Sequence, residues 1–205
     1  MTLCLLSAGA DPIPTPAPIS NEELVDIKKV DPTILVELRY AGSKNVAGRP
    51  LYPADMPALV RASVAQRLVK AQAYLQQSGY GLKIWDAYRP PVAQAQLWEL
   101  FRNASFVANP ADGRGSLHTW GVAVDATLVD ANGNELSMPT DFDAFTSAAG
   151  LHYKGNNPEV ARHLRILQAA MKRGGFYGLR TEWWHFIAYN WKKFGPVHET
   201  KFSSR

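Results

Sequence analysis

The chain has 205 residues, 46% of them hydrophobic and 20% charged, which suits one globular domain with a sizeable core and leaves little room for a second. The net charge is +4, but the basic residues form no run, so we expect no nucleic-acid partner. The single cysteine, Cys4, excludes an internal disulfide framework and a multi-thiolate zinc site. Any metal must therefore be held by histidines and carboxylates.

The first 20 residues form a signal-like, Pro-rich leader. The apolar run in MTLCLLSAGA ends at Ala8-Gly9-Ala10, a pattern typical of a cleavage site, and DPIPTPAPIS follows it. No Lys or Arg precedes the run, which is at the short limit for a secretory signal. We therefore expect export to the periplasm, with the cytoplasm as the alternative. No other stretch is long or apolar enough to form an integral membrane segment.

The first half of the chain predicts two strands and two helices. Alternation predicts a strand over residues 34–40, and a buried strand follows at residues 81–85. Between them, residues 56–79 carry an apolar helical stripe, with Pro57 near its first turn and Gly79 beyond its end. Pro91 can open a second helix. Its expected apolar side carries Val92, Leu97, Leu100 and Phe101.

The second half predicts a strand over residues 121–128, a helix and a final strand over residues 182–189. The helix is opened by Asn157-Pro158 and closed by Gly174-Gly175. Strands and helices do not alternate strictly along the chain. This order predicts an α+β fold with a mainly antiparallel central sheet flanked by helices.

His118 and Asp125 lie in a stretch, RGSLHTWGVAVDATL, that suits a metal site. Small residues surround His118, and strand alternation places Asp125 on one face with Ala123 and Thr127. A strand can half-bury a carboxylate only where a cation or several donors compensate for its lost hydration. With one more imidazole, these residues would form the ligand set of a hydrolytic zinc. An ordinary surface-loop histidine is the alternative, and this stretch alone leaves both open.

His185 is the best candidate for the third ligand. Alternation in EWWHFIAY places it among aromatic residues, where a core histidine is the alternative. Glu182 favours the metal site, because a carboxylate near a buried histidine is costly to desolvate without a partner. A water activated by zinc also needs such a base close by. A regular strand would send Glu182 and His185 to opposite sides, so we expect Glu182 to lie at a bend before the strand proper.

Arg89 follows a buried strand in WDAYRPP, where two prolines hold it. Hydrolysis of an amide builds negative charge on the carbonyl oxygen, and a fixed guanidinium can stabilise that charge. A structural ion pair between Arg89 and Asp86 is the alternative, and this stretch does not decide between the two.

Together these motifs resemble those of the VanX-type D-alanyl-D-alanine dipeptidases, in the zinc D,D-peptidase family that shares its fold with the hedgehog signalling domain. The resemblance rests on S-x-H-x-x-G-x-A-x-D from Ser116 to Asp125, E-x-W-H from Glu182 to His185, and DAYRP before them. It extends to ELRYAGSKNVAGRPLY and MPTDFD, and so covers about residues 35–186. It implies that residues 21–205 form a single zinc peptidase domain.

The resemblance also implies roles for individual residues. The family's ligands for one Zn²⁺ per chain fall on His118, Asp125 and His185. Its catalytic base falls on Glu182 and its transition-state arginine on Arg89. Positions around the termini of the dipeptide fall on Tyr40, Ser116 and Asp143. The segment AFTSAAGLHYKG is less charged than in close relatives, so the resemblance does not determine which residues form the rim of the pocket.

The resemblance implies zinc-dependent hydrolysis of the D-alanyl-D-alanine dipeptide to free D-alanine, in peptidoglycan and cell-wall metabolism. The nearest alternative is a D,D-carboxypeptidase that acts on longer peptidoglycan stem peptides through an open cleft. A metal-bearing binding module without turnover is a third reading, but binding alone requires neither Glu182 nor Arg89. The expected partner is a small dipeptide substrate, and the oligomeric state is left open.

Overall fold

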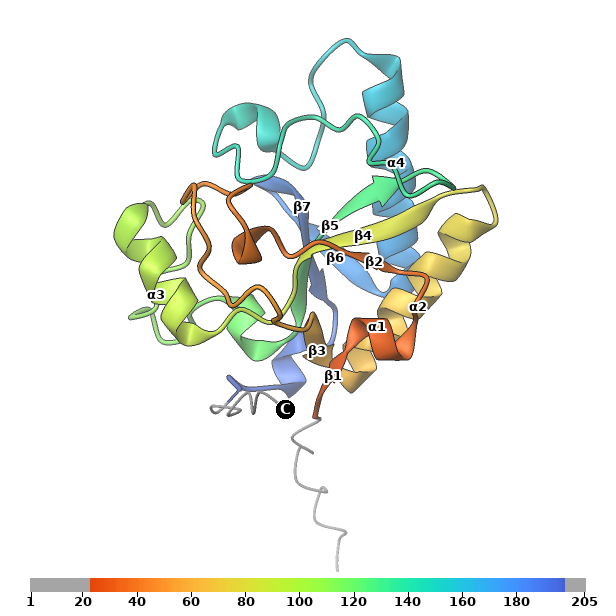
Figure 1. The fold of residues 1–205 in the computed structure, drawn as a ribbon. Coiled ribbons are helices and arrows are strands. Elements are labelled where there is room, and N and C mark those ends of the chain that lie inside the picture. The colour runs from red at the N-terminus through yellow and green to blue at the C-terminus, as the bar shows by residue number, and fades with distance from the viewer. Residues whose placement is uncertain (1–22, 198–205) are drawn as a thin grey trace, which may run out of the picture.

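The computed structural model describes residues 23–197, and the predicted leader, with Cys4, lies outside them. Its centre is a five-stranded sheet of order β2-β4-β5-β7-β6, in which β2 and β4 are parallel and the other pairs antiparallel (Figure 1). The strands are β2 (Leu35–Val36), β4 (Gly81–Asp86), β5 (Ala123–Val129), β7 (Glu182–Ala188) and β6 (Phe176–Leu179). This sheet confirms the predicted α+β class.

Helices α2 (Ala62–Gln76) and α4 (Pro158–Gly174) pack together against the sheet, at the right of Figure 1. The ends of α4 are those that the sequence predicts. The Asn157 side chain accepts hydrogen bonds from the first turn, and Gly175 closes the helix with φ +90°. Fully buried leucines of both helices join the main core, and burial of each contributes about 1.5 to 3 kcal/mol.

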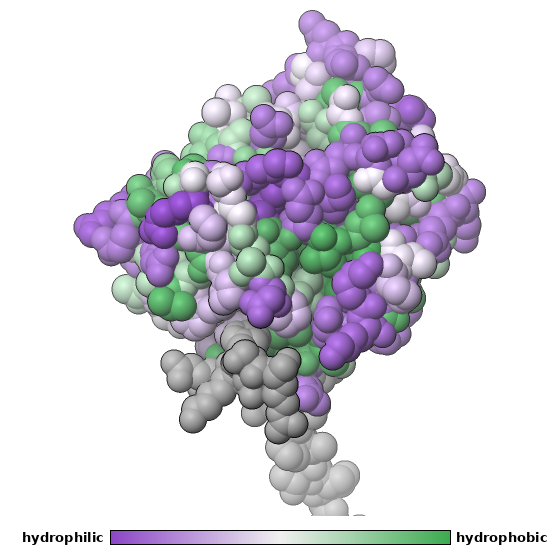
Figure 2. All heavy atoms as spheres, in the orientation of Figure 1, coloured by the Kyte–Doolittle hydropathy of each residue, from purple (hydrophilic) through white to green (hydrophobic). Residues whose placement is uncertain are grey.

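Helix α3 (Pro91–Leu100) lies apart from these two helices, at the left of Figure 1, over a smaller core. Its predicted apolar side is partly wrong: Val92 is 64% exposed and Leu100 is 47% exposed. Hydrophobic residues accordingly show at the surface over α3 in Figure 2. The helix buries Ala93, Gln94 and Leu97 instead, because small residues allow close approach and the Gln94 amide has partners inside.

The strand predicted over residues 34–40 is shorter in the structure. Its regular part ends at Val36, and the chain then turns into a 3₁₀ helix, Arg39–Ala41. The Tyr40 carbonyl accepts hydrogen bonds from the backbone N–H groups of Leu51 (2.7 Å) and Tyr52 (3.0 Å) instead of joining the sheet. The turn carries Tyr40 off the sheet and into the cavity described below.

The predicted start of the long helix is also wrong. Helix α2 begins at Ala62, because the residues before it form β3 (Leu59–Arg61), which pairs with β1 (Leu24–Asp26). The sequence pattern missed β1, β6 and the short helix α1 (Ile27–Val30). Across residues 23–197, no helix combines the length and apolar character needed to cross a membrane.

Candidate active site

A cavity of about 380 Å³ is lined by all the site residues that the sequence singled out. They are Tyr40, Arg89, Ser116, His118, Asp125, Asp143, Glu182 and His185. A larger cavity of about 910 Å³ contains none of them, and its buried Arg39 is paired with Glu135 at 2.7 Å. The smaller cavity is therefore the candidate active site, because histidines and carboxylates that can bind a metal or transfer a proton line it.

The sheet sets Asp125 and His185 side by side. They are register partners in the antiparallel pair of β5 and β7, so their side chains project together from one face. His118 comes from the 3₁₀ helix Leu117–Trp120, which Ser116 caps by accepting a hydrogen bond from the His118 N–H (3.3 Å). Gly121 closes this turn at φ +69°, where an added Cβ would come within 2.6 Å of the Leu24 side chain.

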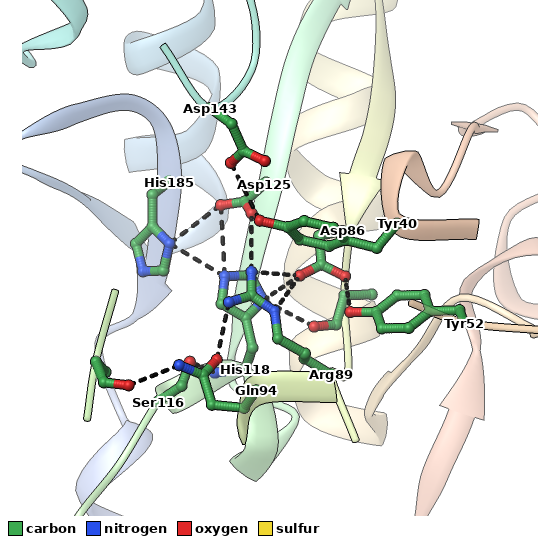
Figure 3. A network of polar contacts seen from close by, with 12 residues as sticks. Tyr40, Tyr52, Asp86, Arg89, Gln94, Ser116, His118, Asp125, Asp143 and His185 are labelled. Atoms are coloured by element: carbon green, nitrogen blue, oxygen red, sulfur yellow. Dashed lines mark hydrogen bonds and ion pairs between the residues drawn. The ribbon is translucent and has the colours of Figure 1, made fainter. Parts of the chain in front are cut away.

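Three ligand-type atoms converge in the cavity (Figure 3). His118 Nε2 lies 3.1 Å from His185 Nδ1 and 3.4 Å from Asp125 Oδ1, and His185 Nδ1 lies 3.0 Å from the same oxygen. Atoms bonded to a tetrahedral zinc at about 2.0 to 2.1 Å are about 3.3 Å from one another. The three side chains therefore already have the spacing of zinc ligands.

The hydrogen bonds of His118 fix which nitrogen faces this cluster. Its Nδ1 lies 2.8 Å from the Ala87 carbonyl oxygen, which can only accept, so Nδ1 carries a proton. In the neutral ring Nε2 is then the nitrogen that presents a lone pair to the cluster. Burial lowers the pKa of His185 and so favours its neutral form. Burial alone would raise the pKa of Asp125, but His118 and His185 lower it overall. A neutral imidazole beside an ionised carboxylate is the donor set that zinc binds.

Glu182 reaches the same cavity because β7 is irregular beside β6. The pairing jumps from Gly178 with Phe186 to Leu179 with Glu182, so the strand does not alternate regularly there. The predicted bend is thus present, although Glu182 is the first residue of β7 and does not precede it. Its Oε2 lies 3.8 Å from His185 Nδ1, and its buried Oε1 has no hydrogen-bond partner among the described residues. The Glu182 carboxylate is beside the cluster and still free to accept a proton.

Burial, followed by the charges of Asp125 and Asp143, raises the pKa of Glu182 well above its ordinary value. Three carboxyl groups share the cavity, and each disfavours ionisation of the others. A divalent cation in the cluster would offset this repulsion. The unpaired Glu182 oxygen and the carboxylate excess both fit a bound zinc.

Arg89 is held on two sides. Its Nε (3.0 Å) and Nη2 (2.7 Å) donate to Asp86 Oδ2, and its Nη1 donates to Gln94 Oε1 (2.9 Å). Burial would lower the pKa of Arg89, but Asp86 raises it overall, so the guanidinium stays charged. The structural ion pair considered as an alternative is present, yet a guanidinium has five N–H donors. Two of them remain for a substrate.

Sequence reasoning missed two residues that support Arg89. Gln94 is 1% exposed and also donates to the Ala108 carbonyl oxygen (2.7 Å). Tyr52 donates its hydroxyl hydrogen to Asp86 Oδ1 (2.8 Å). The one signal for Gln94 was a polar residue placed between Ala93 and Leu97 on the predicted helix. Tyr52 ends the segment ELRYAGSKNVAGRPLY, which the resemblance covers without giving this residue a role.

Asp143 and Ser116 lie on opposite sides of the ligand cluster in Figure 3. Asp143 accepts hydrogen bonds from the Tyr40 hydroxyl (3.1 Å) and the Val46 N–H (3.1 Å) and has φ 57°, a strained value for a residue with a side chain. Burial raises the pKa of Asp143 to about 7. The cavity therefore has a carboxyl group at the Asp143 end and an uncharged hydroxyl group at the Ser116 end.

A buried cluster of two histidines and an aspartate, with a free glutamate and a fixed arginine beside it, defines a zinc hydrolase site. Residues 20–194 match the model of the M15 peptidase family, described as D-ala-D-ala dipeptidase. The chain belongs to this family.

The curated relatives have consistent names. A D-alanyl-D-alanine dipeptidase of Escherichia coli (strain K12) is 37% identical over 164 residues, which is 80% of this chain and 83% of the relative. A D-alanyl-D-alanine dipeptidase of Enterococcus faecalis is 27% identical over 168 residues, 73% of this chain and 83% of the relative. A solved structure of a VanY D,D-pentapeptidase in complex with Zn(II) has 16% identity and a TM-score of 0.40, covering 65% of this chain and 75% of that chain.

Proposed function

We propose that the protein is a zinc-dependent dipeptidase that hydrolyses D-alanyl-D-alanine to two molecules of D-alanine, in peptidoglycan metabolism. The observation that carries the proposal is the convergence of His118, Asp125 and His185 beside the unpaired carboxylate of Glu182. Membership of the M15 family and the relatives named D-alanyl-D-alanine dipeptidase support the substrate.

Glu182 is the group that moves protons. A zinc held by His118, Asp125 and His185 supplies, when bound, the Lewis acidity that activates water and polarises the peptide carbonyl. Glu182 Oε1 accepts the proton of the attacking water and then donates it to the amine that leaves. Because this oxygen has no hydrogen-bond partner within residues 23–197, no such bond has to break before the proton is accepted.

Arg89 stabilises the charge that develops during the reaction. Asp86 and Gln94 occupy three of its N–H groups and fix the plane of the guanidinium. The two remaining N–H groups can donate to the carbonyl oxygen as it becomes negative. Fixed donors need no reorganisation when the charge appears, which is why they accelerate the step.

The ends of the cavity suit the two charges of a free dipeptide. Asp143, oriented by Tyr40, would hold the ammonium group, and the Ser116 end would hold the carboxylate. A cavity of about 380 Å³ is small enough to enclose a dipeptide. The alternative D,D-carboxypeptidase would need an opening at the Asp143 end for the rest of the stem peptide.

Acetylation of the substrate amine separates these two functions. The acetyl group removes the charge that Asp143 would bind, so we expect kcat/KM for N-acetyl-D-Ala-D-Ala to fall by at least about ten- to a hundredfold relative to the free dipeptide. Steady-state kinetics with both substrates and a stem pentapeptide measure this directly. Equal rates for all three would favour the carboxypeptidase.

We also propose that the protein is exported to the periplasm, on the basis of the apolar run and small residues in the first 10 positions. The mature chain should then begin near Asp11. N-terminal sequencing of the protein from its native host measures this, and a chain that keeps Met1 or Thr2 in the cytoplasmic fraction would refute export.

A further inference from the structure

We propose that Arg114 binds the free carboxylate of the dipeptide. It would thereby make the enzyme prefer a substrate with a charged C-terminus over one whose C-terminus is uncharged. This inference rests on the proposed function, since it assigns a partner to one end of the same substrate. Nothing in the motifs that carry the family resemblance includes Arg114, which lies two residues before Ser116.

Of the cations that line the cavity within residues 23–197, one has no carboxylate partner for its charge. Among the lysines and arginines of residues 23–197, only Arg89 and Arg114 line it. Arg89 is committed to Asp86 by two hydrogen bonds. Arg114 is exposed and has no carboxylate within ion-pair distance in the part of the chain that the structure describes. A substrate carboxylate that enters the cavity therefore finds its unpaired cation in Arg114.

Two tryptophans hold Arg114 in place. Its guanidinium lies 5.0 Å from the centre of the Trp191 ring, and its carbonyl oxygen accepts a hydrogen bond from Trp120 Nε1 (3.0 Å). The two indole rings contact each other edge to face, with centres 5.9 Å apart. Both the backbone and the side chain of Arg114 are thus restrained before any ligand binds, which lowers the entropy cost of using it.

The position of Arg114 matches the polarity of the cavity. Arg114 lines the cavity two residues before Ser116, and Asp143 lies across the ligand cluster from Ser116 (Figure 3). A guanidinium at one end and a carboxylate at the other match the two charges of a zwitterionic dipeptide. Arginine also binds a carboxylate through two parallel N–H groups, which adds directional specificity.

Binding to a variant that cannot turn over tests this assignment independently of catalysis. Zinc-loaded Glu182→Gln protein, with and without Arg114→Gln, is titrated calorimetrically with D-Ala-D-Ala and with its C-terminal amide. We expect Arg114→Gln to weaken binding of the dipeptide by about tenfold and to leave binding of the amide nearly unchanged. Lys192→Gln is the matched control, because Lys192 lies over the same Trp191 ring at 5.7 Å but does not line the cavity.

Weaker binding of D-Ala-D-Ala by Arg114→Gln, with binding of its amide and of the Lys192→Gln control unchanged, supports the assignment of Arg114. Equal affinities with and without Arg114, an equal loss for acid and amide, or no binding of the dipeptide would overturn it. Turnover of D-Ala-D-Ala by the unmodified protein is measured separately, so failure of the proposed function is seen as the absence of D-alanine and not as a change in affinity.

Discussion

Replacing His185 with alanine is expected to remove most of the bound zinc and nearly all hydrolytic activity. His185 Nδ1 lies within 3.0 to 3.1 Å of both other ligand atoms, so its loss opens one corner of the cluster. A site left with one imidazole and one carboxylate has two protein ligands where a catalytic zinc uses three. Zinc per chain is measured by elemental analysis of the folded, gel-filtered protein, together with the rate of dipeptide hydrolysis.

His163→Ala is the matched control for this variant. His163 is also buried, at 2% exposure, but it lies on α4 and its Nδ1 contacts the Ser137 carbonyl oxygen at 3.0 Å, outside the cavity. It should keep one zinc per chain. Full zinc occupancy in His185→Ala would contradict the ligand assignment, whatever its activity.

Glu182→Gln is expected to lower kcat by about 10²- to 10⁴-fold, the usual contribution of a general base, while zinc content stays near one per chain. Glutamine has almost the same shape, and Glu182 Oε1 makes no hydrogen bond in the part of the chain that the structure describes, so the fold should tolerate the change. The amide cannot accept the proton of water. Steady-state rates and zinc content are measured on the same preparation.

Glu135→Gln controls for the loss of a carboxylate elsewhere. Glu135 binds Arg39, Lys83 and the Trp85 indole at 2.7 to 3.1 Å and does not line the active-site cavity. Its substitution should leave kcat within about twofold, because neither Glu135 nor its partners Arg39, Lys83 and Trp85 line the cavity where the reaction takes place. Turnover retained in Glu182→Gln would show that another group takes the proton.

Local periodicity predicted the parts of the site that a single element determines. Alternation along β5 placed Asp125 on the side of Ala123 and Thr127, and the Asn157 and Gly175 signals set both ends of α4. Each of these depends on neighbours in the chain, which a sequence pattern contains. The approach of Asp125 to His185 cannot be predicted from such neighbours. The two residues are 60 positions apart, and only the pairing of β5 with β7 brings them together. The sequence could propose that link only from the residue types, as a third ligand beside a carboxylate, and the resemblance to a family then supported it.

The predictions that failed concern residues whose conformation is decided by distant partners. Alternation predicts a strand at Tyr40, but its carbonyl oxygen accepts hydrogen bonds from the N–H groups of Leu51 and Tyr52. Its hydroxyl donates a hydrogen bond to Asp143. Helical periodicity favoured Val92 and Leu100 as the buried side of α3, whereas the structure buries Gln94 against Arg89. A buried polar group is stable only with a hydrogen-bond partner, and the sequence does not say where that partner will lie.

The most direct measurement is the release of D-alanine from D-Ala-D-Ala by the zinc-loaded protein, followed by chiral chromatography. The site predicts two molecules of D-alanine for each dipeptide consumed, with release stopped by a chelator and restored by zinc. This result requires the cluster, Glu182 and the cavity to act together on one substrate. Intact dipeptide after prolonged incubation with protein that carries one zinc per chain would contradict the proposed function.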